Sequence, residues 1–261
     1  MNITSKSISI VTGGTGGLGR SISDAILNAG GKLLFVARDY DRITEYENSL
    51  NEESRKLFFK FRADLRNKSD IDRFKNYLIY LLSSSGDIVE IFLFNNASTI
   101  DPIALIEDID FESISNALIV NIASAFALSS IVLGIQKSHK LHKANIINIS
   151  SGVSMNPVKG WSSYCISKAG LNMLSRCIAT ENETRDKAIT VLSINPGPIN
   201  TEMQKKIRTA NADKIPATKK FEAMFSENKL QHPKDVADKL FRILEEHNYT
   251  SGDFIDFNTI D

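Results

Sequence analysis

A tyrosine and a lysine stand four residues apart in a stretch with the periodicity of a helix, at Tyr164 and Lys168. Because four residues make about one turn, both side chains should project from the same face. A phenol with its ordinary pKa of about 10 is a poor acid–base group at neutral pH, and we expect the lysine ammonium to lower that pKa. Ser151 follows a short apolar run, and its hydroxyl can donate to an oxygen that gains negative charge. These three residues indicate proton transfer at an oxygen.

Such a tyrosine–lysine pair is by itself most often part of a solvated helix face, and it gains weight from a glycine cluster near the N-terminus. Five of the eight residues from Thr12 to Gly19 are glycine, and the cluster lies between an apolar run and a helical pattern. Glycines allow the backbone to turn tightly and to approach a pyrophosphate, which the free N–H groups of a helix N-terminus then bind. With this strand–turn–helix context, we expect a dinucleotide site rather than a bare tight turn.

Arg38 and Asp39 follow the second apolar run, where a dinucleotide fold meets the adenosine ribose. A carboxylate at this point accepts from the ribose 2′-hydroxyl and favours NAD, whereas a cation favours the 2′-phosphate of NADP. Arg38 therefore predicts a preference for NADP(H) over NAD(H). An ordinary ion pair between Arg38 and Asp39 is the competing interpretation.

The elements that must position these residues alternate regularly along the chain. The expected strands are short aliphatic runs at 8–11, 33–36, 57–61, 91–94, 146–149 and 190–194, with an edge strand at 254–257. The expected helices span 18–29, 40–51, 69–82, 111–135, 161–181 and 233–247. This alternation predicts an α/β fold: a single-domain, Rossmann-type, doubly wound parallel sheet with helices on both faces, over residues 1–261. The one long break, 196–229, is expected to be a substrate-binding loop or lid.

Charge and composition exclude several classes of partner. The 261 residues include 31 basic and 31 acidic side chains, so no net charge attracts nucleic acid or an anionic membrane surface. No apolar run approaches the roughly 18 residues of a membrane span, and the N-terminus lacks a secretory pattern. Two cysteines, Cys165 and Cys177, favour free thiols in a reducing, cytoplasmic compartment. Lysines flank His139 and His142, so we expect no metal site there.

Together these residues resemble the short-chain dehydrogenase/reductase family over nearly the whole chain. Its glycine motif matches Thr12, Gly13, Gly17 and Gly19, and its N-N-A-G motif matches 95–98 with Ser98 in place of glycine. The resemblance implies a catalytic set of Asn121, Ser151, Tyr164 and Lys168. It implies cofactor contacts from Gly13, Thr15, Gly17, Leu18, Gly19, Arg38, Asp64, Leu65, Asn95, Ala97, Tyr164, Lys168, Pro196, Gly197, Ile199 and Thr201.

The resemblance also implies a role for each catalytic residue. Tyr164 would donate a proton to the forming alkoxide, and Ser151 would orient the carbonyl. Lys168 would lower the tyrosine pKa and bind the nicotinamide ribose. Asn121 would hold a water that relays protons to Lys168.

Two departures from the family pattern concern the cofactor. Ser98 places a side chain where the family usually has none, and we expect it to disturb the ribose contact. Gly16 stands where NADPH-preferring members often carry a second basic residue, so the cofactor preference depends on Arg38 alone.

Two longer stretches, 159–165 and 196–204, resemble the sepiapterin reductase and benzil reductase branch of the family. This implies a ketone, a vicinal diketone or a pterin-like substrate. We expect Trp161 and Met203 to border the substrate beside Ser151 and Tyr164, although Met203 would equally suit a core. Asp256 matches the aspartate that anchors the pterin in sepiapterin reductases, and an edge-strand aspartate facing water is the alternative.

The expected function is therefore that of an NADPH-dependent carbonyl reductase acting on a small molecule. The family resemblance further implies a homodimer or homotetramer through the helices around 123–133 and 171–179. A sugar-nucleotide epimerase or dehydratase uses the same tyrosine and lysine, but too little chain follows Lys168 for its separate substrate domain. A non-catalytic NADPH-binding regulator is the alternative from another class, and the complete catalytic set argues against it.

Overall fold

Seven parallel strands form one sheet in the order β3-β2-β1-β4-β5-β6-β7. The computed structural model describes residues 3–138, 141–184, 188–210, 217–246 and 248–260. The strands are β1 (Ser7–Thr12), β2 (Lys32–Ala37), β3 (Phe58–Arg62), β4 (Glu90–Asn95), β5 (Lys143–Ile149), β6 (Ala188–Asn195) and β7 (Phe254–Asp256). The order of strand addition reverses between β1 and β4, which is the point where ligands bind in open parallel sheets.

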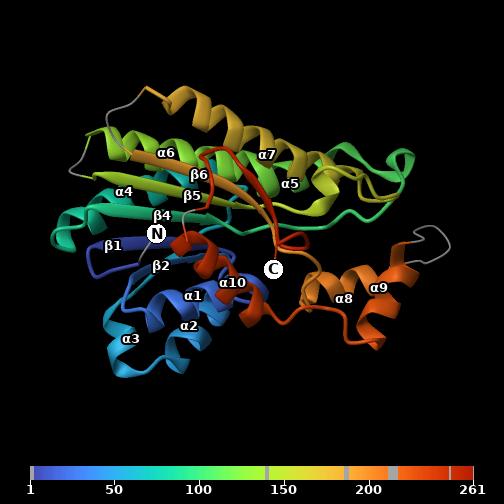
Figure 1. Ribbon diagram of the computed structural model, residues 1–261, viewed down its shortest axis with the longest axis horizontal. Coiled ribbons are helices and arrows are strands. Elements are labelled where there is room, and N and C mark those ends of the chain that lie inside the picture. Colours follow the sequence, from blue (N-terminus) through green and yellow to red (C-terminus); the bar gives the residue numbers. More distant parts are fainter. Residues whose placement is uncertain (1–2, 139–140, 185–187, 211–216, 247, 261) are drawn as a thin grey trace.

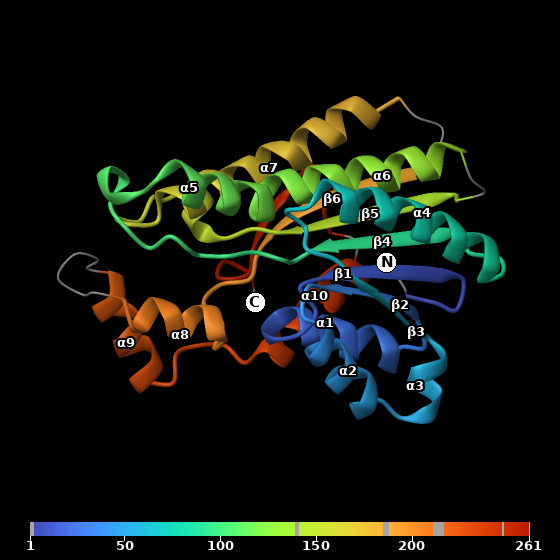
Figure 2. The same cartoon turned by 180° about the vertical axis from the view of Figure 1, so that it is seen from behind.

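Helices cover both faces of this sheet (Figures 1 and 2). One core lies between the sheet and α1 (Gly17–Asn28), α2 (Tyr40–Ser49) and α10 (Pro233–Glu246). The second core lies between the sheet and α4 (Lys68–Ser84), α6 (Ser124–Ser138) and α7 (Ser162–Asn182). The central strands are buried on both faces: every residue of β1 is buried, Ser7 and Ser9 included, and β4 is an unbroken apolar run from Ile91 to Phe94. The predicted doubly wound Rossmann-type sheet is confirmed.

A short helix that was not predicted follows the predicted helix 40–51. The predicted helix is α2, which ends at Ser49, and the additional helix is α3 (Glu52–Lys56). Leu50 is extended, and the Asn51 side chain accepts a hydrogen bond from Ser54 N at 2.8 Å. This cap starts a new helix instead of continuing the old one.

The predicted helix 111–135 is continuous but contains a π turn. It consists of α5 (Phe111–Leu118), a π-helical segment η2 (Ile119–Ala123) and α6, which runs on to Ser138. The expectation that no apolar stretch approaches a membrane span was wrong. Phe111–Ser138 reaches a mean hydropathy of 2.2 over an 18-residue window, of which 39% is buried, so by length and composition it could cross a membrane. Its polar residues are too small and scattered to break the apolar stretch.

The segment 196–229 leaves the sheet after β6 and carries two helices, α8 (Glu202–Arg208) and α9 (Ala217–Ser226). Both views show these helices beyond the ends of the strands, on the side where the N-terminal part of α7 also lies (Figures 1 and 2). Two 3₁₀ turns, η1 (Ile106–Asp108) and η3 (Gly152–Ser154), lie in the loops after β4 and β5.

Candidate active site

The carboxyl ends of the parallel strands bring the predicted cofactor residues to one edge of the sheet. The glycine loop follows β1, Arg38 follows β2, and Asp64 and Leu65 follow β3. Asn95 ends β4 and precedes Ala97, and Pro196, Gly197, Ile199 and Thr201 follow β6. The alternation of strands and helices therefore gathers residues that are far apart in the sequence.

Close packing explains the glycines that follow β1. Gly13 has a φ of +66°, and a Cβ on it would lie 2.9 Å from Ala97 Cα. A Cβ on Gly19 would lie 2.4 Å from the Gly13 carbonyl oxygen. Thr12 Oγ1 accepts hydrogen bonds from Asn96 N and Ala97 N at 3.0 Å. The loop after β1 is thus tied to the loop after β4, across the point where the strand order reverses.

The N-terminus of α1 is suited to an anion. Gly16 is its N-cap and supplies no side-chain cap, and the first turn contains no acidic residue. A Cβ on Gly16 would meet nothing within 4 Å, so space is open beside these N–H groups. Thr15 is half-buried in the turn, and Leu18 is buried beneath it. This cradle fits the pyrophosphate of a dinucleotide.

Arg38 is exposed, and it makes no ion pair in the described part of the chain. The competing pair with Asp39 is not formed. Asp39 instead caps α2, accepting from Asp41 N at 3.1 Å and Arg42 N at 3.2 Å, and it lies 3.9 Å from the Arg42 guanidinium. The Arg38 guanidinium is therefore available to a ligand at the end of β2.

Asp64 is less available for a contact with the cofactor than the family resemblance implies. Arg66 donates to both of its carboxylate oxygens, with Nη2 2.6 Å from Oδ2, and this hydrogen bonding lowers the pKa of Asp64. Asp64 N donates to Asp70 Oδ2 at 2.9 Å. The neighbouring Leu65 packs partly buried against the second core. An adenine contact at this point would have to form beside the Arg66 pair.

Ser151, Tyr164 and Lys168 come together as predicted. Tyr164 and Lys168 lie one turn apart on α7, with Lys168 Nζ 5.3 Å from the centroid of the tyrosine ring. Ser151 caps η3 after β5 and forms a hydrogen bond with Tyr164. Lys168 is 2% exposed, and its Nζ donates to the Ile149 carbonyl oxygen at 2.7 Å.

The electrostatics of this group differ from the expectation. Burial raises the pKa of Tyr164 to about 12, although the hydrogen bond from Ser151 opposes the rise. Burial lowers the pKa of Lys168 to about 7. The prediction that Lys168 lowers the tyrosine pKa was thus wrong, because burial dominates and raises that pKa. A four-residue spacing fixes proximity, but desolvation disfavours both charged forms.

Asn121 lies in the π turn and is 1% exposed. Its Oδ1 accepts from Ser98 Oγ at 3.1 Å and Thr99 N at 2.7 Å. Its Nδ2 donates to the Thr99 carbonyl oxygen at 2.8 Å and to Ser167 Oγ at 3.1 Å. These four bonds use the full capacity of the amide, so the side chain cannot hold the expected water. Ser98, expected to disturb a cofactor contact, instead turns toward Asn121.

Other polar residues support the site without having been predicted. Ser167 Oγ donates to the Tyr164 carbonyl oxygen at 2.8 Å and so joins Asn121 to α7. Asn172 accepts from Ser150 Oγ at 2.6 Å and donates to Ser154 Oγ at 2.8 Å, which fixes the loop that carries Ser151. The sequence did contain a signal for Ser167 and Asn172. Ser167 lies three residues after Tyr164 and Asn172 four residues after Lys168, so each shares a helix face with one of the predicted residues.

An apolar cluster covers Tyr164. It contains Trp161 and Tyr164 with Ile100, Cys165 and Ile207, and Met203 packs partly buried against it. The Trp161 ring meets Tyr164 edge-on at 6.3 Å and stacks on Phe221 of α9 at 5.5 Å. The predicted substrate-side residues Trp161 and Met203 therefore lie beside Tyr164, and α8 and α9 form the wall opposite α7.

Asp256 lies at the same edge but is engaged internally. Its Oδ1 accepts from Asn195 Nδ2 at 2.9 Å, from Asn258 N at 2.9 Å and from Asn258 Nδ2 at 2.7 Å. Asn195 in turn lies against Gly152, the residue after Ser151, where an added Cβ would be 3.1 Å from its amide nitrogen. Asp256 thus holds the turn after β6, and it is half-buried rather than facing water.

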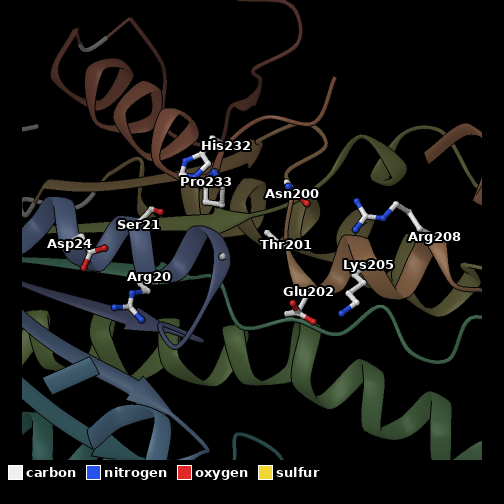
Figure 3. A pocket seen from close by; sticks show the side chains of 11 residues that line it. Arg20, Ser21, Asp24, Asn200, Thr201, Glu202, Lys205, Arg208, His232 and Pro233 are labelled. Atoms are coloured by element: carbon white, nitrogen blue, oxygen red, sulfur yellow. The ribbon is translucent and has the colours of Figure 1, made fainter. Parts of the chain in front are cut away.

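A pocket of about 460 Å³ lies on the outer side of the glycine loop. Its side chains come from α1, α8 and the start of α10 (Figure 3). Gly17 and Thr201 form one wall, and a Cβ on Gly17 would lie 2.8 Å from Thr201 Cγ2. None of the four predicted catalytic residues lines it, so this pocket adjoins the cofactor loop rather than the reacting groups.

Within the described ranges, no group of three or more His, Cys, Asp or Glu side chains could hold a metal ion, and His139 lies outside those ranges. His247, the last residue of a predicted helix, lies outside them as well. Cys165 is buried, Cys177 is exposed, and both are free thiols, as predicted.

A glycine-rich anion cradle at the switch point and a Ser-Tyr-Lys group beside it define a dinucleotide-dependent oxidoreductase. Residues 7–212 match the short chain dehydrogenase family, and the chain belongs to this family. Family members use NAD(P)(H) and act on small molecules.

Individual relatives extend over almost the whole chain. It is 30% identical to the benzil reductase ((S)-benzoin forming) of Bacillus cereus over 94% of this chain and 97% of the relative. It is 27% identical to the sepiapterin reductase of Bos taurus over 97% of this chain and 94% of the relative. The crystal structure of the KRED1-Pglu enzyme superposes with a TM-score of 0.79 at 26% identity, covering 95% of this chain and 99% of that one. The predicted resemblance to the benzil and sepiapterin reductase branch is confirmed.

Proposed function

We propose that this protein is an NADPH-dependent carbonyl reductase that acts on a ketone or a vicinal diketone. The observation that carries the proposal is the position of Tyr164: it bonds to Ser151, lies one turn from the buried Lys168 and forms part of the apolar cluster under α8 and α9. An apolar cluster that adjoins a phenol and a hydroxyl suits a carbonyl carbon between apolar substituents.

Reduction needs a proton donor, and the site supplies one. A bound nicotinamide dinucleotide supplies the hydride. Tyr164, with a pKa of about 12, is protonated throughout the neutral range and can give its phenolic proton to the alkoxide oxygen. Ser151 accepts a weak bond from Val153 N at 3.4 Å, and its single hydroxyl proton, which faces Tyr164, would turn to the substrate carbonyl when a substrate binds. Once Lys168 is protonated, its charge stabilises the resulting phenolate.

Asn121 acts in this proposal by positioning its neighbours. It joins the loop after β4 to Ser167, and Ser167 bonds to the main chain of Tyr164. Because its side chain is saturated, a water that relays protons to Lys168 would bind to the Asn121 main chain.

The preference for NADP(H) over NAD(H) is proposed from Arg38. This guanidinium is exposed at the end of β2, and Asp39 is occupied as a helix cap. Within the described residues this cation forms no salt bridge, although it is near enough to Asp64 to help lower the pKa of that carboxyl, and a cation at this point suits a 2′-phosphate better than a 2′-hydroxyl.

The substrate class is proposed from the apolar cluster and from the benzil reductase relative, whose name specifies a diketone. The sepiapterin reductase relatives favour a pterin-like substrate as a second candidate. For a pterin, Asp256 would accept through Oδ2, because its Oδ1 already accepts from Asn195 and Asn258.

Assembly as a homodimer or homotetramer is proposed from an exposed apolar surface. Phe126 of α6 is 60% exposed, and Ile166 and Met173 of α7 are 56% and 54% exposed. These helices cover the same face of the sheet. A second copy of the chain that covers this surface would account for the exposed apolar residues of the helix Phe111–Ser138. Ala125 of the same helix is part of the second core, so it does not contribute to this surface.

A panel of ketones, diketones and pterins with NADPH tests the proposed function. We expect NADPH oxidation with at least one diketone, at a rate that NADH does not match. NADPH binding measured by fluorescence, without oxidation on any member of the panel, would favour the regulator instead.

A further inference from the structure

Trp161, beside Tyr164, and Gln204 of α8 carry buried polar atoms without a hydrogen-bond partner in the described part of the chain. Ser163 Oγ and Arg208 Nη1 are unpaired there as well. Trp161 is 3% exposed, and its Nε1 has no acceptor. Gln204 is 4% exposed, and neither its Nε2 nor its Oε1 is paired. Buried polar atoms are nearly always paired, because an unpaired one retains the full cost of its desolvation. These atoms point to a partner that the folded chain itself does not supply.

Both side chains belong to the surroundings of one apolar cluster. Trp161 is the N-cap of α7 and contacts the Tyr164 ring edge-on. Gln204 and Ile207 are the buried residues of α8, and their three-residue spacing puts them on the same face of that helix. Ile207 packs in the cluster with Trp161 and Tyr164. The Gln204 amide therefore lies on the face of α8 that is turned toward the catalytic helix.

Gln204 also leaves a local partner unused. Thr201 and Gln204 have the spacing of a capping box, in which the glutamine side chain would bond back to the main-chain N–H of the cap residue. Thr201 Oγ1 does accept from Gln204 N at 3.3 Å, but the amide makes no return bond. The side chain is buried instead, and it keeps its two donors and its acceptor for another group.

We propose that Trp161 and Gln204 form a binding site for a second oxygen of the substrate, next to the carbonyl that Ser151 and Tyr164 hold. The indole N–H and the amide N–H would both donate to this oxygen. The inference rests on the carbonyl reductase function proposed above and narrows its substrate class. This binding site would favour a 1,2-dicarbonyl, or a carbonyl with a neighbouring acceptor oxygen, over a simple ketone.

Two features of the donors define the oxygen further. Both are neutral, so they suit a neutral carbonyl or hydroxyl oxygen. Around them, Met203, Val158 and Phe221 pack against the cluster, so the substituents of the dicarbonyl would be apolar or aromatic.

The test compares two probes that differ by one oxygen, 1-phenylpropane-1,2-dione and 1-phenylpropan-1-one, at saturating NADPH. The variants Gln204→Met and Trp161→Phe keep the size or the aromatic ring and remove the polar groups. We expect each to lower the ratio of kcat/KM for the dione to kcat/KM for the monoketone about tenfold, the loss of about one hydrogen bond. Glu222→Met, on an exposed position of α9, is the matched control and should keep the wild-type ratio.

Thermal unfolding separates this role from a structural one. Removing an unpaired buried amide should leave the melting temperature of Gln204→Met at or above that of the wild type. A lower melting temperature together with an unchanged ratio would assign Gln204 to folding and overturn the inference. Unchanged ratios in both variants would overturn it as well.

If the wild type reduces neither probe, the proposed function is contradicted. The binding affinity for the dione then tests the second oxygen site separately. In calorimetric titrations of the dione into NADP-saturated protein, Gln204→Met should weaken binding about tenfold relative to wild type and to Glu222→Met. Equal affinity in all three proteins would overturn the second oxygen site independently of any turnover.

Discussion

The Nζ of Lys168 lies 5.3 Å from the centroid of the Tyr164 ring, yet it donates to the main-chain oxygen of Ile149. Both side chains are buried, and burial moves their pKa values in opposite directions, to about 12 for the phenol and about 7 for the ammonium. The site therefore holds a protonated acid beside a lysine that is only partly charged at neutral pH. This arrangement favours proton donation by Tyr164, the direction that carbonyl reduction requires.

The buried lysine makes stability depend on pH. The pKa of Lys168 falls from 10.5 to about 7 on folding, so between these values the unfolded chain binds more protons, and this residue makes the wild type more stable as pH rises. Below about pH 7 the full cost of the buried charge is present. Lys168→Met removes this dependence, so its melting temperature relative to wild type should be highest near pH 6 and should fall toward pH 10. A difference that stays constant or grows with pH would contradict the burial of a titrating lysine.

Replacing Arg38 should affect one dinucleotide and not the other. Arg38→Ala is expected to raise the KM for NADPH by about tenfold or more, since a charge-assisted bond to the 2′-phosphate is lost, while the KM for NADH changes little. Arg42→Ala, which removes a nearby exposed guanidinium that pairs with Asp39, is the control. Equal losses with NADPH and NADH in Arg38→Ala would rule out a role in phosphate recognition.

The exposed apolar surface makes a prediction about assembly. Phe126→Glu places a charge at the centre of the proposed contact and should shift the chain toward monomers in sedimentation velocity. Tyr80, 65% exposed on α4, offers the control Tyr80→Glu, which should sediment like the wild type. If Phe126→Glu and wild type have the same mass in solution, this surface is not the interface.

The bonds of Asn121 predict unequal effects on folding. Asn121→Leu leaves Thr99 N and Ser167 without their partner and should reduce the free energy of unfolding by more than about 2 kcal/mol. Ser98→Gly removes only one of the bonds to Asn121 and should cost about 1 kcal/mol. Urea unfolding of both variants measures the difference, and equal losses would show that Ser98 and not the amide holds this loop.

The sheet, the order of its elements and the position of the catalytic residues were predictable because they follow from local patterns. Aliphatic runs mark strands buried on both faces, and a spacing of four residues brings Tyr164 and Lys168 together. The π turn at Asn121 was not predictable, because nothing in its apolar sequence distinguishes it from α-helix. The pKa values depend on burial from all sides, which a pattern within one helix does not contain.

Hydrogen-bond partners also decided the roles of single residues. Asp64 binds Arg66 and Asp39 caps α2, both within three residues along the chain, whereas Asp256 holds Asn195 of another strand. The sequence places each acid near a predicted ligand position, but it does not show which of several possible partners the carboxylate binds. Gln204 escaped notice because its spacing from Thr201 suggests an ordinary capping box, and only its burial reveals the unpaired amide.

The most direct test of the central claim is NADPH oxidation by Tyr164→Phe and by wild type with the same diketone, together with NADPH binding to each. The wild type should oxidise NADPH when the diketone is present. The variant should bind NADPH almost as tightly but turn over about 10²–10⁴-fold more slowly, because one positioned acid–base group is lost. A variant that keeps more than about a tenth of the wild-type rate, with NADPH binding intact, would contradict Tyr164 as the proton donor.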